Sequence, residues 1–221
     1  MGGAAAPRLH PPAPAATPYP GRPRRPSRIQ KKLPTVVAQV QQAHPTAEVE
    51  LWTMDEHRLG LKPILRRMWR RKGQGGVVPV QPRYEWLYLY AFVRPRTGQT
   101  YWLVLPTVST AAMNLALAEF ARDIGAGAER QLILVVDQAG WHTSGDLVVP
   151  DGVHLEPLPA YSPELQPAER LWALTDEAVG NRHFTTLDEL QDAQAEHCLR
   201  LSAQAGRVRA QTLFHWWPAA A

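Results

Sequence analysis

The sequence of 221 residues contains a single cysteine, Cys198, and no run of 18 or more apolar residues. One cysteine excludes an internal disulfide framework and a cysteine-clustered zinc site, and it fits a reducing, cytoplasmic setting. The lack of a long apolar run excludes a membrane-spanning helix, and the lack of an apolar leader with a small-residue cleavage site argues against secretion. We therefore expect a cytoplasmic protein that has no membrane partner.

Acidic residues are missing from residues 1–34, which hold seven of the 24 Lys and Arg residues and nine of the 21 prolines. Such a stretch cannot bury enough apolar surface to fold, so we expect a disordered Pro/Arg-rich arm at 1–30 and one folded domain at 31–218. The arm has two open interpretations: it contacts phosphates, or it is non-adaptive sequence from a displaced start or a shifted frame. Beyond residue 34 the chain is mildly acidic, with 17 basic and 20 acidic residues.

Six of those 17 basic residues crowd into the segment LKPILRRMWRRKG (61–73). Apolar residues are interleaved with them, so one face of the segment can pack while the other presents cations to phosphates. A solvated charged edge is the alternative. A single basic strip on an acidic domain gives the electric field a direction, which favours phosphate contact. The residues expected to contact DNA in this basic strip are Lys62, Arg66, Arg67, Arg70, Arg71 and Lys72.

Strand-like and helix-like segments alternate along the rest of the chain. A short helix is expected to end before His44, and helical spacing between a cap at Ser109 and a stop at Gly125 predicts another. Further helices are expected at roughly 163–180 and 185–204, and strands at 49–56, 84–93, 100–106, 131–137 and 152–159. The second and third strands are predicted to form a hairpin, because their connector contains a glycine. This order predicts an α/β fold with a mixed sheet, in which antiparallel strands come first and parallel strands follow through helical crossovers.

Two aspartates follow apolar strand segments, Asp55 after ELWTM and Asp137 after QLILVV. An aspartate at the carboxyl end of a strand opens into the crevice where α/β sheets place their functional sites. For either residue alone, strand termination is the commoner explanation. Two such residues at the ends of neighbouring strands favour a site.

A third acid is expected from the segment YSPELQPAERLW (161–172). Pro167 suits the first position of a helix. Glu169 then lies in the first turn and shares a face with Trp172, so the tryptophan can enter the core while Glu169 faces the strand ends. Glu164 is the rival, but it resembles an acid that complements a helix N-terminus.

Three converging carboxylates repel one another unless a cation lies among them. Because no cysteine is available and His142 is the only nearby imidazole, oxygen ligation by Asp55, Asp137 and Glu169 suits Mg²⁺ or Mn²⁺. Two such ions about 4 Å apart can activate a water or a 3′-hydroxyl and stabilise the leaving oxygen in phosphodiester transfer. His142 is assigned to DNA contact, with a local hydrogen bond as the alternative. Glu56 points to the opposite face if the strand continues, and we interpret it as structural.

The segments LWTMDEHRLGLKPILRRMW, VVDQAGWHTS and above all YSPELQPAERLW resemble the DDE transposases of the bacterial insertion-sequence 630 family, relatives of the mariner elements. The resemblance covers roughly residues 30–218. It implies a ribonuclease-H-like fold, a mixed sheet flanked by helices, with metal-dependent DNA cleavage and joining of the freed end to target DNA. It also implies that Asp55, Asp137 and Glu169 are the metal-binding catalytic acids.

The chain departs from that family in its first segment. Family members normally begin with helix-turn-helix modules that recognise the ends of the element, whereas the Pro/Arg-rich arm stands in that place here. A separate helix-turn-helix subunit is therefore one expectation. A truncated inactive remnant that binds DNA or regulates an intact transposase is an alternative function, and a host nuclease of the same fold is another. The expected partners are DNA, as transposon ends and target, and a second copy of the chain in a homodimer.

Overall fold

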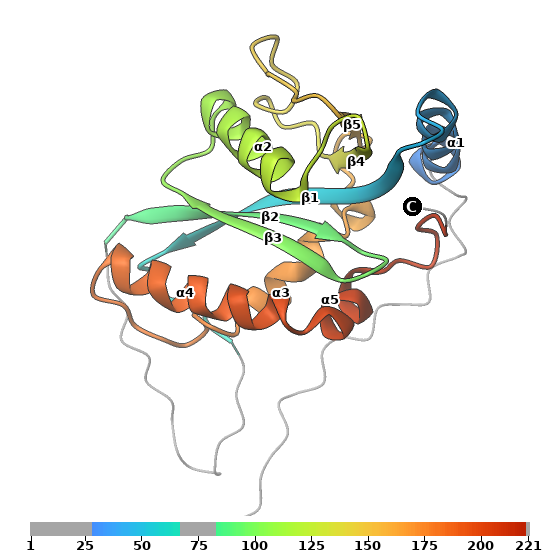
Figure 1. Cartoon of the computed structure of the whole chain (residues 1–221). Coiled ribbons are helices and arrows are strands. Elements are labelled where there is room, and N and C mark those ends of the chain that lie inside the picture. Colours follow the sequence, from blue (N-terminus) through green and yellow to red (C-terminus); the bar gives the residue numbers. More distant parts are fainter. Residues whose placement is uncertain (1–27, 67–82, 220–221) are drawn as a thin grey trace, which may run out of the picture.

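A mixed five-stranded sheet forms the centre of the computed structural model, which describes residues 28–66 and 83–219 (Figure 1). The strands are β1 (Glu48–Gly60), β2 (Trp86–Arg94), β3 (Gln99–Leu105), β4 (Arg130–Val136) and β5 (Val153–Pro157), and their order is β3-β2-β1-β4-β5. β1, β2 and β3 pair antiparallel, whereas β4 pairs parallel with both β1 and β5. The predicted hairpin and the predicted mixed sheet are both confirmed.

Helices cover both faces of this sheet (Figure 1). They are α1 (Arg28–Ala43), α2 (Thr110–Ile124), α3 (Trp172–Thr175), α4 (Leu187–Ser202) and α5 (Ala205–Thr212). α2 lies on one face, and α4 and α5 lie on the other. The Ser109 hydroxyl caps α2 by accepting from the Ala112 amide at 3.1 Å, and Gly125 ends it with a φ of 79°. The sequence signals for this helix are therefore confirmed at both ends.

Apolar side chains from alternate strand positions fill a core on each face of the sheet. Trp52 and Met54 of β1 pack with Phe120 of α2 on one face. Leu59 of the same strand packs on the other face with Leu201 of α4. β4 has the sequence RQLILVV, and all but its first residue are buried, as expected of a parallel strand that is covered on both faces. The packing on both faces of β4 therefore fixes the position of Asp137, the residue that follows the strand.

Two elements extend beyond their predicted bounds. α1 begins at Arg28, so residues 28–30 are helical rather than part of an arm, because Ile29 and Leu33 are buried against the core. β1 runs on to Gly60 instead of ending near residue 56, since β2 supplies hydrogen-bonding partners as far as that residue. The rest of the expected arm, residues 1–27, lies outside the described residues, and the division into arm and domain stays a prediction.

The helix expected at 163–180 is wrong as one continuous element. Two short 3₁₀ turns, Pro163–Leu165 and Ala168–Leu171, precede the single turn of α3. Pro167 explains the break between the two turns, because a proline inside the segment lacks the amide hydrogen that a continuous helix needs. The segment therefore folds as a chain of short turns that wraps over the sheet.

Two smaller predictions can also be compared with the fold. The single cysteine, Cys198 of α4, is 3% exposed and packs in the core as a small apolar side chain. Within residues 28–66 and 83–219, no helix combines the length and the apolar character that crossing a membrane requires.

Candidate active site

Asp55 of β1 and Asp137, the residue after β4, occupy equivalent positions in the register of these two neighbouring strands. The last parallel pair between β1 and β4 joins Thr53 to Val135, and each aspartate follows two residues later. β4 ends at Val136, so β1 loses this neighbour just before Asp55. The sequence suggested that Asp55 ends a strand, whereas the structure places it inside β1. The end of β4 nevertheless opens the expected crevice beside it.

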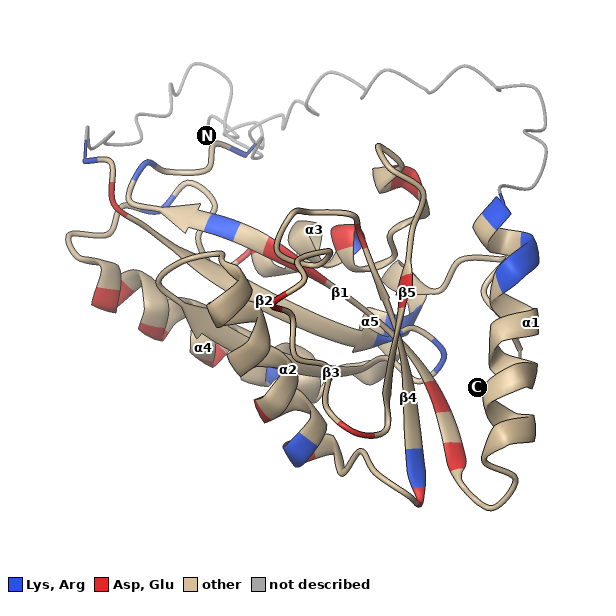
Figure 2. Cartoon of the chain, turned by 90° about the horizontal axis from the view of Figure 1, so that it is seen from above, with Lys and Arg blue, Asp and Glu red and all other residues tan. Residues whose placement is uncertain are grey.

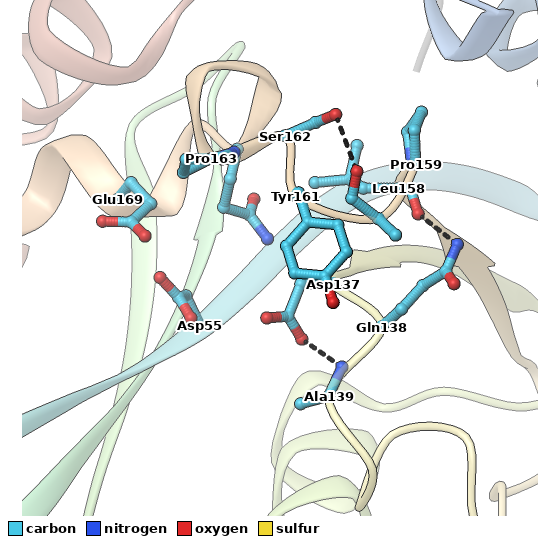
Figure 3. Close-up of a pocket in the computed structure, with 12 residues that line it drawn as sticks. Asp55, Asp137, Gln138, Ala139, Leu158, Pro159, Tyr161, Ser162, Pro163 and Glu169 are labelled. Atoms are coloured by element: carbon cyan, nitrogen blue, oxygen red, sulfur yellow. Dashed lines mark hydrogen bonds between the residues drawn. The ribbon is translucent and has the colours of Figure 1, made fainter.

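The turns at 163–171 bring a third carboxylate over this crevice. Gln166 anchors them, because its Nε2 donates to the Met54 carbonyl at 2.9 Å and its Oε1 accepts a hydrogen bond from the Thr53 hydroxyl. Gln166 is only 2% exposed, so these bonds are shielded from water. Figure 3 shows the result: the carboxyl groups of Glu169 and Asp55 point toward one another across the crevice.

All three predicted acids line one open pocket of about 470 Å³. One carboxylate oxygen of Asp137 points into the pocket on the side of Asp55 (Figure 3). Glu164, the rival third acid, is not among the residues that line it. The structure thus brings Asp55, Asp137 and Glu169 together from β1, from the residue after β4 and from the turn before α3.

Burial and neighbouring negative charges disfavour the ionised form of two carboxyl groups in this pocket. Burial raises the pKa of Asp55 well above its ordinary value, and the negative charges of Glu169, Glu56 and Asp137 raise it further. Burial also raises the pKa of Glu169, although the nearby His57 and a hydrogen bond from Trp172 act in the opposite direction. Carboxylates in this condition are stabilised by a cation.

A stacked aromatic pair supports Asp55 from behind. Trp172 Nε1 donates to Asp55 Oδ2 at 3.3 Å, and the indole stacks on His57 with ring centroids 4.8 Å apart and an interplanar angle of 12°. His57 Nε2 in turn lies 3.0 Å from Asp176 Oδ1. The sequence analysis missed His57 and Asp176. The available signal was the alternation of β1, which places His57 on the same face as Asp55.

His142 is a correction, because the sequence assigned it to DNA contact. Its side chain has no exposed surface, and its ring lies between two carboxylates, with Nδ1 2.7 Å from Asp137 Oδ1 and Nε2 3.0 Å from Glu56 Oε1. A buried ring with both nitrogens engaged cannot reach a phosphate. Glu56 does point away from the face of Asp55, as expected, yet through His142 it is connected to Asp137.

The basic strip is only partly described. Lys62 and Arg66 are exposed, and neither lines the acidic pocket. Arg66 is fixed to α3 and to the loop that follows it. Its Nη2 donates to the Ala173 carbonyl of α3 at 3.2 Å, and its backbone exchanges two hydrogen bonds with the side-chain amide of Asn181 in the loop. The other four members lie outside the described residues: Arg67, Arg70, Arg71 and Lys72.

Basic positions flank the acidic centre of the molecule. Figure 2 shows red positions in the middle of β1, a blue position further along that strand, and a group of blue positions in the first turns of α1. The sequence identifies these as Arg58 on β1 and as Arg28, Lys31 and Lys32 on α1. Of these residues, Lys32 is paired with Glu156, and the Arg58 guanidinium lies over the ring of Trp86. Cations at these positions attract an anionic polymer.

The donor set fits a hard divalent cation. In the described ranges, no three His, Cys, Asp or Glu side chains are already drawn together as a metal cage. The three carboxylates that line the pocket would therefore have to come closer together to share a cation, which would offset their mutual repulsion. Three carboxylates around an open pocket supply the oxygen ligands that Mg²⁺ or Mn²⁺ takes, and they leave room for the waters that Mg²⁺ retains.

Two sequence comparisons bear on this geometry. The model of a family described as DDE superfamily endonuclease matches residues 50–191, a range that contains all three acids. An uncharacterised protein of Sinorhizobium fredii (strain NBRC 101917 / NGR234), y4pE/y4sA, is 41% identical over 114 residues, which are 51% of this chain and 80% of that protein.

Solved structures show the same fold at low sequence identity. The Mos1 mariner paired-end complex with Mn has a TM-score of 0.51 and 17% identity, and the match covers 88% of this chain and 66% of that one. The paired-end complex with Mg has a TM-score of 0.50 and 15% identity, with coverage of 91% and 67%. The chain thus spans about two thirds of the length of these Mos1 chains. The predicted ribonuclease-H-like architecture is confirmed.

Proposed function

The chain belongs to the DDE superfamily endonuclease family, and on that basis we propose that it is a transposase catalytic domain. It cleaves DNA phosphodiesters with divalent metal ions and transfers the freed strand to target DNA. Its expected place of action is the cytoplasm. A single cysteine and a fold held by apolar packing fit that compartment.

The observation that carries this proposal is the meeting of Asp55, Asp137 and Glu169 in one open pocket. They come from three separate elements, in the order Asp, Asp, Glu along the chain, inside the range that the family matches. Half-burying the Asp55 carboxylate beside two further carboxylates costs stability, so a purely structural role gives no reason for the arrangement. Its intact state also speaks against the alternative of an inactive remnant.

Mg²⁺ or Mn²⁺ is the proposed cofactor, held by Asp55, Asp137 and Glu169. The related Mos1 complexes were solved with Mn and with Mg, which supports the use of a divalent ion here. We propose two ions, which when bound would activate a water or a 3′-hydroxyl and stabilise the leaving oxygen of the phosphodiester.

The remaining side chains of the site orient these carboxylates. Trp172 holds one oxygen of Asp55 by a hydrogen bond, and Gln166 fixes the turn that carries Glu169 to the backbone of β1. The hydrogen bond from His142 lowers the pKa of Asp137 and so keeps this carboxylate ionised. A site whose ligands are held in this way loses little entropy when a metal ion binds.

DNA is the proposed partner, as transposon ends and as target. One of the similar solved structures is a Mos1 transposase paired-end complex with the left transposon end, which supports this assignment. Lys62 and Arg66 are proposed to contact phosphates, together with Arg67, Arg70, Arg71 and Lys72 of the same strip. A homodimer and a separate helix-turn-helix subunit complete the proposal for the working assembly.

A nicking assay on supercoiled plasmid with Mn²⁺ tests the proposed chemistry. Asp55→Asn, Asp137→Asn and Glu169→Gln should each abolish nicking, because each removes a charged ligand and keeps its volume. Glu164→Gln is the matched control: it alters the other glutamate of the same segment, which does not line the pocket, and should nick like the wild type. Activity retained in any one of the first three variants would remove that residue from the site.

A further inference from the structure

We propose that Glu56 and His142 form a buried relay that orients Asp137, by holding one of its carboxylate oxygens so that the other faces the pocket. The inference rests on the proposed function, because it gives a role to two residues behind a proposed metal ligand. Neither residue lines the pocket, so both act through Asp137 as positioning residues.

The geometry of the relay is a line of three side chains. His142 Nδ1 lies 2.7 Å from Asp137 Oδ1, and Nε2 lies 3.0 Å from Glu56 Oε1. Both partners are carboxylate oxygens, which accept hydrogen bonds, so the ring can donate from Nδ1 to Asp137 and from Nε2 to Glu56.

The rear end of the relay is itself fixed. Glu56 has only 5% of its side chain exposed, and the same oxygen that meets His142 also accepts a hydrogen bond from Trp141 Nε1 at 3.1 Å. It belongs to β1, one residue after Asp55, so the relay ties the support of Asp137 to the strand that carries Asp55. A shift of either strand end would be transmitted to both aspartates together.

The front end of the relay acts on a single oxygen of Asp137. The Ala139 amide donates to Oδ1 at 3.0 Å, and His142 contacts the same atom. In Figure 3 this oxygen faces Ala139, while the other one points into the pocket. The side chain of Asp137 is 51% exposed, so packing alone does not fix its rotamer, and the hydrogen bonds to Oδ1 must do so.

Two substitutions of His142 test whether its hydrogen bond orients Asp137 or whether its side chain only fills the space behind Asp137. The amide nitrogen of asparagine falls near the position of Nδ1 and can donate to Asp137, whereas that of glutamine reaches toward Nε2 and serves Glu56 instead. His142→Gln should weaken Mn²⁺ binding about 10–100-fold, the usual cost of losing a supporting hydrogen bond to a metal ligand. His142→Asn should keep most of the affinity.

The measurement is a Mn²⁺ titration of the full chain without DNA, followed by the electron paramagnetic resonance signal of the free ion. Melting temperatures of the variants check that each is folded. Equal Mn²⁺ affinity in the Asn and Gln variants would overturn the relay. Failure of the wild type to bind Mn²⁺ would instead contradict the proposed function, so the two failures are distinguishable.

Variants of Glu56 test the relay from its rear end and do not depend on the stability of the histidine variants. Glu56→Gln keeps an acceptor oxygen for His142 and should bind Mn²⁺ nearly as well as the wild type. Glu56→Leu removes that acceptor, frees the imidazole and should lower Mn²⁺ affinity in the same way as His142→Gln. Unchanged affinity in Glu56→Leu would contradict the proposal.

Discussion

At the scale of one residue, the Asp55 carboxylate that is proposed to bind a metal ion also lowers the stability of the metal-free fold. It lies on a buried central strand, and both its burial and the neighbouring carboxylates raise its pKa. A group whose pKa is raised on folding binds protons more tightly in the folded state. The folded protein therefore gains stability as the pH falls through that raised pKa toward 3.8, and lacks this stability at neutral pH.

Asp55→Asn should therefore stabilise the metal-free protein. The amide keeps the shape of the side chain and removes the buried charge, so we expect a gain of about 1 kcal/mol in the free energy of unfolding at about pH 7.5. The gain should shrink at about pH 5, where more of the wild-type carboxyl is protonated. Denaturant unfolding at the two pH values measures it, with the exposed Asp151→Asn as a control that should change little. A less stable Asp55→Asn protein at neutral pH would contradict this account of the site.

The sequence predicted acids more readily than their supports. Asp55 and Asp137 follow apolar runs, and Glu169 follows a proline, so local patterns identify them. The hydrogen bonds of His57 to Asp176 and of His142 to Glu56 join residues 119 and 86 positions apart. Strand alternation places His57 on the face of Asp55, but it does not identify Asp176 or Glu56 as the partners of His57 and His142, so the supporting role of His57 was missed and His142 was assigned to the surface. The roles of the three acids stay predictions.

The segment 163–175 is the element on which the site depends most. Its prolines divide it into short turns with few hydrogen bonds of their own, so its position comes from contacts with the sheet. Gln166 supplies two of them, to the Thr53 hydroxyl and to the Met54 carbonyl. The sequence suggested one long helix here because it could not show that an amide of the segment would bond to β1.

Gln166→Leu should destabilise the protein and loosen Glu169. The substitution keeps a large side chain but leaves two buried polar groups of β1 without partners, at a cost of about 1–3 kcal/mol each. Denaturant unfolding should show a fall of about 2 kcal/mol or more. Gln191→Leu, on the exposed face of α4, is the matched control and should stay close to the wild type. Equal stability of the two variants would show that Gln166 does not anchor the segment.

At the scale of the whole molecule, the distribution of charge matters more than its sum. The formal net charge is +4, yet three carboxylates line the pocket, and basic positions lie on β1 and in the first turns of α1 (Figure 2). The change from antiparallel to parallel pairing along the chain followed from the sequence, because antiparallel and parallel segments differ in their apolar patterns. The position of the basic strip relative to the pocket did not follow, since it depends on how the chain after β1 returns to the sheet.

Lys62→Ala should weaken DNA binding without altering its sequence preference. Loss of one phosphate contact should reduce the slope of log K against log salt by about 1. Arg200→Ala is the matched control: Arg200 is paired with Glu196 on α4, away from the residues of the pocket, and its loss should leave the slope unchanged. The measurement is a binding titration on duplex DNA at several salt concentrations. Equal slopes for Lys62→Ala and the wild type would remove this residue from the DNA-binding surface.

The central claim is that Asp55, Asp137 and Glu169 together bind divalent cations, and anomalous X-ray scattering from crystals grown with Mn²⁺ tests it most directly. The account predicts an anomalous peak in the pocket, in contact with carboxylate oxygens of all three residues. It also predicts that the peak disappears in crystals of the Asp137→Asn protein. Bound Mn²⁺ found only elsewhere in the molecule, with these three side chains free of metal, would contradict it.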